Sequence, residues 1–299
     1  MKYHRTLHGW LIIDKPEGLT SNQVLGRLRY KLNRPKAGFA GTLDPFATGV
    51  LPVAFGEATK LIDRMVDVQK TYVFTVQWGT KTDTDDREGT VIQTSDHRPT
   101  RQEILEALPT FTGILSQIPP LYSAIKVQGK RACDRVRNAE DITLPPRPVH
   151  VESFDLVKII DKNQAVFQVV CGKGTYVRSL ARDLGEKLGT VAHVTTLSRE
   201  SVGPFSKGQA VSYDKLLEGD GPFDVQQFMH PIETVLDDIP ALSIDAEEVK
   251  KIRHGQSISC PSMDRSFLKE IPLYDETHQL IAMSVIKGDR VFPSRVFVY

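Results

Sequence analysis

Residues 41–49 (GTLDPFATG) place one carboxylate, Asp44, among apolar neighbours and between two glycines. One interpretation is structural, because an aspartate before a proline commonly begins a helix as its N-cap, with the proline at the first helical position. The other interpretation is functional. Pro45 holds Asp44 in an extended conformation, and Leu43 and Phe46 keep water away, so the carboxylate is poised as a nucleophile. The two interpretations are compatible.

A carboxylate that is shielded from water has a raised pKa unless a cation compensates for the lost hydration. Arg178 is the best candidate for that cation, because it lies at the start of a predicted helix directly after a glycine turn. Arg182, one helical turn later, is the second candidate. The alternative for either arginine is an ordinary solvated charge.

The glycine turn itself, residues 172–175 (GKGT), lies between a predicted strand and a predicted helix. It lacks the order of a P-loop, so ATP binding is not expected. The backbone of this turn, together with Lys173, could pass close to an RNA phosphate.

Tyr72 lies near the start of residues 71–78, where apolar and polar residues alternate as in a strand with one buried face. The ordinary interpretation is a half-buried core tyrosine. The alternative is a platform on which a nucleobase stacks, since such a contact contributes about 1–3 kcal/mol per base.

Metal and disulfide chemistry are not expected. The histidines are scattered without a metal-binding motif, and the acidic run at residues 82–86 (TDTDD) lacks the order of a calcium loop, so it is interpreted as a polar turn. The three cysteines are far apart and form no C-x-x-C pair. They therefore predict neither a disulfide framework nor a zinc site.

Several elements that must position these residues are predicted from local signals. Thr20 and Gln23 form a capping box that begins a helix over 20–33, and Thr100 with Glu103 begins another that ends before Pro109. A strand over 164–171 precedes a helix that begins near residue 177 and ends at Gly189. The tail of the first helix is strongly basic, through Arg27, Arg29, Lys31, Arg34 and Lys36.

Residues 123–149 are expected to form an insertion of extended, looping backbone that reaches a partner. Proline-rich stretches lie on both sides of its basic segment, which includes Lys126, Lys130 and Arg131. The last sixty or so residues change character. Asp245 and Glu248 cap a short helix that ends at Gly255, and short strands follow. We therefore predict one domain over 1–238 and a small β-rich domain over 239–299.

The whole chain has 299 residues, with 40% hydrophobic and 25% charged residues, as in an ordinary globular protein. Its formal charge of +1 means that a polyanion would have to be met by a local basic patch. The apolar run at residues 10–13 is too short for a signal peptide, and no run approaches the roughly 20 apolar residues that cross a bilayer. We expect a cytoplasmic protein that does not associate with membranes.

Seven motifs, in order over most of residues 9–200, resemble the TruB-type tRNA pseudouridine synthases. They are residues 14–21 (DKPEGLTS), 41–45 (GTLDP) with Gly49, 56–60 (GEATK), 70–72 (KTY), 117–126 (QIPPLYSAIK), 172–178 (GKGTYVR) and 192–197 (AHVTTL).

This resemblance implies an enzyme that isomerises uridine 55 in the tRNA T-loop to pseudouridine by base flipping, without a metal or organic cofactor. By the resemblance Asp44 is the catalytic aspartate, Arg178 its ion-pair partner, Tyr72 the residue that packs on the target base, and Leu197 part of the pocket wall. Whether the aspartate attacks the base or the sugar, or assists elimination, stays open. The fold implied is α+β: a mixed, largely antiparallel central sheet with flanking helices, plus a small PUA-like C-terminal domain.

The resemblance also implies how tRNA is held. The T-loop and T-stem would contact Phe39, Gly41, Thr42 and Lys173, and the C-terminal domain would contact the acceptor stem. The basic tail of the first helix and the basic insertion would supply phosphate contacts. Phe39 stands where the family usually has histidine, so it can stack but cannot donate a hydrogen bond. We expect a monomer with no obligate protein partner.

Two other hypotheses compete with this one. A tRNA-folding chaperone would use the same basic surfaces without chemistry, and this activity can coexist with catalysis. A guide-RNA-dependent synthase is the other, but the chain has no obvious protein-docking extension. Asp44, Tyr72 and Arg178 together favour the enzyme, because a pure binder has no need of a buried ion pair.

Overall fold

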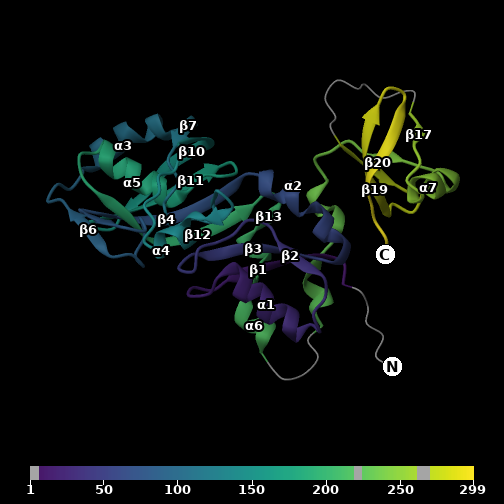
Figure 1. The fold of residues 1–299 in the computed structure, drawn as a ribbon, viewed down its shortest axis with the longest axis horizontal. Coiled ribbons are helices and arrows are strands. Elements are labelled where there is room, and N and C mark those ends of the chain that lie inside the picture. The colour runs from purple at the N-terminus through teal and green to yellow at the C-terminus, as the bar shows by residue number, and fades with distance from the viewer. Residues whose placement is uncertain (1–6, 219–223, 261–269) are drawn as a thin grey trace.

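The structure is a computed structural model that describes residues 7–218, 224–260 and 270–299. A large sheet runs through its centre in the order β14-β1-β3-β12-β4-β11-β10-β7, and three further strands pair at its side (Figure 1). The path consists of β14 (Val211–Ser212), β1 (Gly9–Lys15), β3 (Thr48–Phe55), β12 (Ala192–Val202), β4 (Lys70–Trp78), β11 (Gln164–Cys171), β10 (Arg147–Ile159) and β7 (Gly113–Gln117). The side strands are β2 (Ala37–Phe39), β13 (Phe205–Ser206) and β15 (Met229–His230).

Strand directions confirm the expected mixed, largely antiparallel sheet. β3 pairs with β12 in parallel and β1 with β14 in parallel, whereas the other pairs along the path are antiparallel. The two strands read from the sequence, β4 and β11, are neighbours in the middle of this sheet. Their inward aromatic residues, Phe74 and Phe167, pack at 5.8 Å between ring centroids. Burial of these rings places a large apolar core at the centre of the sheet.

Helices flank the sheet, and several begin where the capping signals predicted. They are α1 (Ser21–Lys31), α2 (Ile62–Asp67), α3 (Arg101–Ala107), α4 (Ala132–Arg137), α5 (Val177–Lys187), α6 (Tyr213–Leu217) and α7 (Ala246–Arg253). Capping boxes form at Thr20, Thr100 and Asp245. α1 ends two residues earlier than the predicted 33, because Asn33 and Arg34 adopt left-handed backbone conformations (φ 61° and 60°) that a helix cannot contain.

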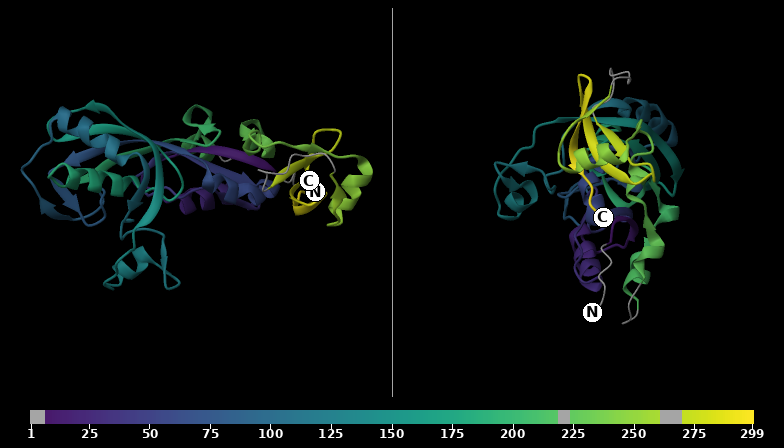
Figure 2. Two further views of the ribbon diagram at one scale, coloured as in Figure 1. Left: turned by 90° about the horizontal axis from the view of Figure 1, so that it is seen from above. Right: turned by 90° about the vertical axis from the view of Figure 1, so that its right-hand side faces the viewer.

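The expected insertion folds differently from the prediction of extended, looping backbone. β8 (Lys126–Val127) and β9 (Lys130–Arg131) form a short hairpin that leads into α4. Its own small apolar cluster includes Ala132, Ile142 and Leu144. We call residues 123–149 the lobe, since Figure 2 (left) shows it projecting from the body of the molecule. Hydrophobic burial within the lobe explains why it is ordered rather than looping. A second hairpin pairs β5 (Thr80–Thr82) with β6 (Val91–Thr94).

A separate five-stranded sheet ends the chain, in the order β16 (Leu242–Ser243), β18 (Ile271–Tyr274), β19 (Leu280–Lys287), β20 (Arg290–Val296) and β17 (Ile258–Ser259). α7 packs on it, and the apolar core includes Ile252 and Leu273. Beyond β20, Phe297 inserts into the core cluster that contains Trp10 of β1. The Lys60 ammonium also donates to the carbonyl of Val296, at 2.6 Å. The small sheet is thereby attached to the body.

Within the described residues, no helix has both the length and the apolar character that a bilayer crossing requires.

Candidate functional site

Asp44 does not begin a helix, so the structural interpretation of residues 44–47 as a helix start is wrong. The backbone makes a single turn, in which the amide of Ala47 donates to the carbonyl of Asp44 at 3.1 Å, and then enters β3. Gly49 has φ 99°, and a Cβ there would lie 2.3 Å from the carbonyl oxygen of Arg199. The chain therefore leaves the turn by a close approach that only glycine permits, and Asp44 remains on a short loop.

The start of α1 holds this loop from one side. The hydroxyl of Ser21 accepts a hydrogen bond from the amide of Leu43 (2.9 Å) and donates one to its carbonyl (3.2 Å). The ammonium of buried Lys15 donates to the carbonyl of Pro45 at 3.2 Å, and the amide of Gly18 donates to the same carbonyl at 2.8 Å. Both residues that flank Asp44 are thus fixed through their backbones.

Arg199 holds the same loop from the other side. This residue of β12 is almost completely buried, and its guanidinium donates to the carbonyl of Val50 at 2.7 Å and to that of Gly41 at 2.9 Å. Gly41 and Val50 are the two ends of the segment that carries Asp44. Arg199 is not predicted from the sequence, because nothing in its local pattern separates it from an arginine on the solvent face of a strand.

Arg178 faces Asp44, as the sequence analysis expected of the best candidate. Its Nε lies 3.0 Å from Oδ2 of Asp44, and its side chain is only 4% exposed. The solvated alternative is therefore wrong for Arg178. The two terminal nitrogens donate to the carbonyls of Thr84 and Tyr122, at 2.9 and 3.0 Å. The Asp44 side chain is 36% exposed, so the carboxylate is held by a buried cation yet can be reached from outside.

A second carboxylate shares Arg178. Oδ2 of Asp86 lies 3.2 Å from Nη1 of Arg178, and the Asp86 side chain is 5% exposed. Its neighbour Asp85 pairs with Arg182 at 3.0 Å. The interpretation of residues 82–86 as a merely polar turn is therefore incomplete. Two arginines one turn apart on a buried helix face need anionic partners. The two adjacent aspartates, Asp85 and Asp86, were the signal in the sequence from which these partners could have been predicted.

The described residues contain no cluster of three or more His, Cys, Asp or Glu that could hold a metal ion.

Burial and neighbouring charges shift the pKa values of the site residues in opposite directions. Burial raises the pKa of Asp44, the Arg178 guanidinium opposes this shift, and the Asp86 carboxylate adds to it. Burial lowers the pKa of Lys15 to about 8, although the Asp44 charge partly offsets the effect. It likewise lowers the pKa of Lys70 to about 8, and the Arg199 charge contributes. Of these two lysines, Lys15 holds the loop of Asp44, although its own charge is costly to bury.

Tyr72 and Leu197 lie in one apolar cluster with Leu43 and Phe46, the residues beside Asp44. Tyr72, on β4, is directly opposite Arg199 of β12. Burial raises the pKa of the Tyr72 phenol, and the Arg199 guanidinium opposes the shift. The structure therefore brings a carboxylate, its arginine, an aromatic ring and an aliphatic wall together from four different segments.

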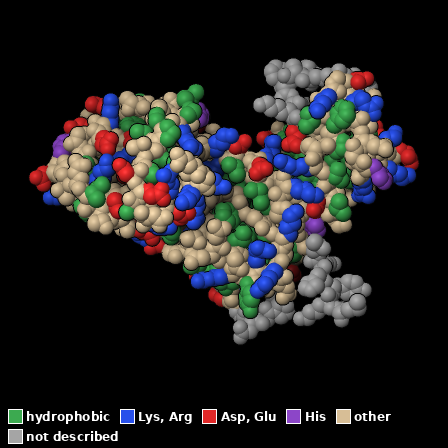
Figure 3. Space-filling model, viewed as in Figure 1, with side chains coloured by type: hydrophobic (Ala, Val, Ile, Leu, Met, Phe, Trp, Pro, Cys, Tyr) green, Lys and Arg blue, Asp and Glu red, His purple; other side chains and the backbone are tan. Residues whose placement is uncertain are grey.

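The remaining predicted residues are spread more widely. Phe39 is half-buried on β2 opposite Val53, Gly41 has φ 76°, and Thr42 is exposed. Lys173 pairs with Asp67 at 2.9 Å on the surface. On the lobe, Lys126 and Lys130 are exposed, whereas Arg131 makes two hydrogen bonds to Asp134, at 2.7 and 3.0 Å. Figure 3 shows Lys and Arg side chains distributed over this face of the molecule.

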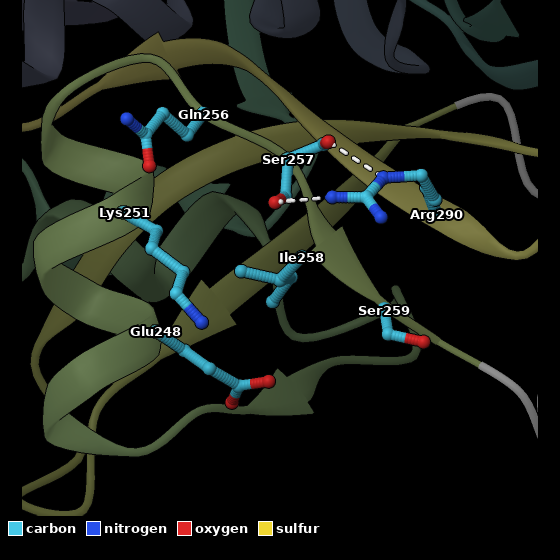
Figure 4. A pocket seen from close by; sticks show the side chains of 7 residues that line it. All are labelled: Glu248, Lys251, Gln256, Ser257, Ile258, Ser259 and Arg290. Carbon is cyan, nitrogen blue, oxygen red and sulfur yellow. Dashed lines mark hydrogen bonds between the residues drawn. The ribbon is translucent and has the colours of Figure 1, made fainter.

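A hollow of about 580 Å³ lies in the C-terminal sheet, away from Asp44 (Figure 4). Arg290 crosses it and donates to the hydroxyl of Ser257 at 2.7 Å. The residues of the predicted site do not line it, so it has no part in the chemistry of Asp44. Its lining consists of Glu248, Lys251, Gln256, Ser257, Ile258, Ser259 and Arg290.

Comparison with protein families gives two adjacent matches. Residues 29–177 match the model described as TruB family pseudouridylate synthase (N terminal domain), and residues 178–237 match tRNA pseudouridylate synthase B C-terminal domain. A protein of Bradyrhizobium diazoefficiens named tRNA pseudouridine synthase B is 44% identical, over 98% of this chain and 86% of that protein. One of the same name from Gluconacetobacter diazotrophicus is 48% identical, over 86% of this chain and 85% of that protein.

Two solved structures share the fold. A chain of a Cbf5-Nop10-Gar1 complex superposes with a TM-score of 0.74 at 25% identity, covering 97% of this chain and 85% of that one. A chain of an H/ACA RNP bound to a substrate RNA containing 2'-deoxyuridine superposes with a TM-score of 0.72 at 23% identity, covering 98% and 86%.

Proposed function

The chain belongs to the TruB family of pseudouridylate synthases, enzymes that isomerise uridine in tRNA, and on that premise we propose that its target is uridine 55 of the T-loop. Asp44 is the catalytic carboxylate, and Arg178 holds and orients it. Tyr72 packs on the target base, and Leu197 forms part of the wall around it. The observation that carries the proposal is the partly exposed Asp44 carboxylate 3.0 Å from a buried guanidinium.

The reaction balances without an added reagent. The N1–C1′ glycosidic bond breaks and a C5–C1′ bond forms, while the base loses the hydrogen on C5 and gains one on N1. Product and substrate are isomers, and no electrons are gained or lost. We therefore propose chemistry that uses no metal and no organic cofactor. Attack of Asp44 on the base, attack on the sugar and assisted elimination all fit this balance.

The uridine must leave its loop to reach Asp44. Flipping a nucleotide costs a few kcal/mol, which stacking on Tyr72 and phosphate contacts can offset. Phe39, Gly41, Thr42 and Lys173 contact the T-loop and T-stem in this proposal. Lys126, Lys130 and Arg131 of the lobe add phosphate contacts, although Arg131 must share its charge with Asp134.

The central sheet and the C-terminal sheet belong to two domains with different roles in this proposal. Residues 1–238 form the catalytic domain, and residues 239–299 form a PUA-like domain that contacts the acceptor stem. The enzyme acts as a monomer without an obligate protein partner, in the cytoplasm where its substrate is modified.

The test is pseudouridine mapping of tRNA incubated with the wild-type protein and with Asp44→Asn. The asparagine keeps the size of the side chain but removes its charge, so we expect binding to persist and conversion to fall by more than about a hundredfold. Equal conversion by both proteins would remove Asp44 from the mechanism. Conversion confined to another uridine would overturn the assignment of position 55 and leave the role of Asp44 standing.

The same variant separates catalysis from the second hypothesis, tRNA-folding chaperone activity. Chaperone activity depends on RNA-binding surfaces and needs no carboxylate. If it coexists with catalysis, Asp44→Asn still accelerates refolding of misfolded tRNA while it forms no pseudouridine.

A further inference from the structure

The C-terminal end of α1 presents an exposed aromatic ring among cations. Tyr30 is 73% exposed, the exposed residues Arg34 and Lys36 follow it, and neither of these two forms an ion pair within the described part of the chain. We call Tyr30, Arg34 and Lys36 the α1 platform. The α1 platform therefore combines an exposed aromatic face with two cations, the combination on which nucleic-acid bases stack.

The platform has a defined geometry. The guanidinium carbon of Arg34 lies 5.9 Å from the centroid of the Tyr30 ring, within the range of a cation–π contact. The amide of Arg34 donates to the carbonyl of Arg29 at 2.6 Å, and the Arg29 side chain donates to the carbonyl of Pro35 at 3.0 Å. The turn that places Arg34 beside the ring is therefore held by its own hydrogen bonds.

Backbone strain points to a role for the Arg34 side chain. Asn33 and Arg34 are consecutive left-handed residues, with φ 61° and 60°. Asparagine tolerates this conformation, but arginine does so only at a cost that glycine would avoid. Such strain is typical of functional positions. The cost is explained if the guanidinium at this place contacts something.

The chemistry of the platform matches an unpaired nucleotide. A base can stack on an exposed tyrosine, and arginine and lysine beside the ring can meet its phosphates. Figure 2 (left) shows α1 on the side of the central sheet from which the lobe projects, and Figure 3 shows Lys and Arg side chains over the lower middle of the molecule, where α1 lies. The platform thus lies among basic side chains on the side of the molecule from which the lobe projects.

Position separates this contact from the flipped uridine. The first residue of α1, Ser21, holds the loop of Asp44, and α1 has 11 residues. A helix of that length is about 16 Å long, so a base on Tyr30 lies roughly that far from the start of the helix. It cannot be the nucleotide that reaches Asp44.

We propose that the α1 platform binds an unpaired nucleotide of the substrate tRNA outside the T-loop, with its base on Tyr30 and its phosphates at Arg34 and Lys36. The proposal rests on tRNA as the substrate but not on which uridine is modified. It makes the platform a contact that selects full-length tRNA over an isolated stem-loop.

The first experiment measures dissociation constants in an Asp44→Asn background, with an unmodified tRNA transcript and with the isolated T-stem-loop. Tyr30→Ala should weaken tRNA binding about tenfold, whereas Tyr30→Phe keeps the ring and should stay within about twofold of the parent. Stem-loop binding should be unchanged by both. Ile114→Ala, which removes an exposed apolar side chain from β7, is the matched control and should change neither constant.

The second experiment relieves the backbone strain at Arg34. Arg34→Gly should raise the melting temperature, because glycine accepts φ 60° without cost, and at the same time weaken tRNA binding and flatten its dependence on salt. Lys162→Ala, in the turn between β10 and β11, is the charge control and should leave the salt dependence unchanged. A purely structural residue would not move stability and affinity in opposite directions.

Unchanged tRNA affinity in both Tyr30→Ala and Arg34→Gly overturns the proposal. Equal losses for the tRNA and the stem-loop overturn it too, because the contact would then belong to the T-arm. Photochemical cross-linking gives a direct reading, since Tyr30 should become joined to a nucleotide outside the T-loop. A wrong assignment of uridine 55 would appear only in the pseudouridine map and would leave these binding constants as they are.

Discussion

At the scale of single residues, the site is a balance of charges around Asp44. Arg178 lowers the pKa of this carboxyl, while burial and the nearby Asp86 raise it. Asp86 also competes for the guanidinium, since it lies 3.2 Å from Nη1. The ionised fraction of Asp44 at a given pH therefore depends on a residue that need not touch the substrate.

Asp86→Asn tests this balance through the pH dependence of kcat. Asp44 must be ionised in our proposal, so activity is lost as pH falls through its raised pKa. Removal of the Asp86 charge lowers that pKa and frees Arg178 to pair with Asp44 alone. The acid limb of the profile should move to lower pH. Asp183→Asn, whose carboxylate pairs with Arg182, is the control and should leave the limb in place. A limb that moves to higher pH contradicts the charge balance.

Arg199 is a second residue whose effect is indirect, because it joins both ends of the Asp44 loop. Arg199→Met removes two charged donors from buried carbonyls, and we expect the free energy of unfolding to fall by about 2–4 kcal/mol. Loosening of the loop should lower kcat at least about tenfold while the dissociation constant for tRNA changes little.

Arg98→Met is the matched control. Arg98 also donates to two backbone carbonyls, those of Ser95 and His97, but these are not part of the Asp44 loop. It should cost stability and spare kcat. A loss of kcat that is equal in the two variants would mean that general destabilisation, and not the loop, is responsible.

At the scale of elements, prediction from sequence succeeded where the signal was local. The capping boxes at Thr20, Thr100 and Asp245 begin helices as expected, because N-cap and third residue are close in sequence. The lobe was predicted poorly, since its hairpin and α4 depend on a small apolar cluster that unites separate segments of the lobe. Asp86 and Arg199 were missed for the same reason, as their partners come from other elements.

The first turn of α1 offers a pair of adjacent hydroxyls with separate tasks. Thr20 caps the helix, whereas Ser21 binds both backbone groups of Leu43. Thr20→Ala should lower the free energy of unfolding by about 1 kcal/mol and leave kcat unchanged. Ser21→Ala should cost a similar amount and also lower kcat, because Leu43 positions Asp44. Chemical denaturation and single-turnover kinetics measure the two effects. Identical kcat values in both variants would show that α1 does not position the loop.

At the scale of the whole molecule, our proposal requires both sheets to contact one tRNA. The small sheet is attached through Leu280 and Met283 of β19 and through the residues after β20. Phe297 is 1% exposed in a cluster with Trp10 and Leu61, and the amide of Val298 donates to the Glu57 carboxylate at 2.9 Å. Neither contact is visible in the sequence, where residues 296–299 look like an ordinary chain end. The burial of Phe297 in the core of the body indicates that the two sheets keep a fixed relation.

Phe297→Ala tests whether that relation matters for substrate choice. Removal of a buried ring lowers the free energy of unfolding by about 3–5 kcal/mol. Detachment of the small sheet from the body can relieve part of this destabilisation. Binding of a tRNA that spans both sheets would then also have to fix the detached sheet in place. KM for full-length tRNA should therefore rise, while KM for the T-stem-loop stays the same. Phe297→Leu, which keeps most of the apolar contact, should fall between wild type and Phe297→Ala. Limited proteolysis near residue 239 should become faster in the same order. If the KM values for tRNA and stem-loop rise together, the ring supports only the fold of the catalytic body and the attachment does not select the substrate.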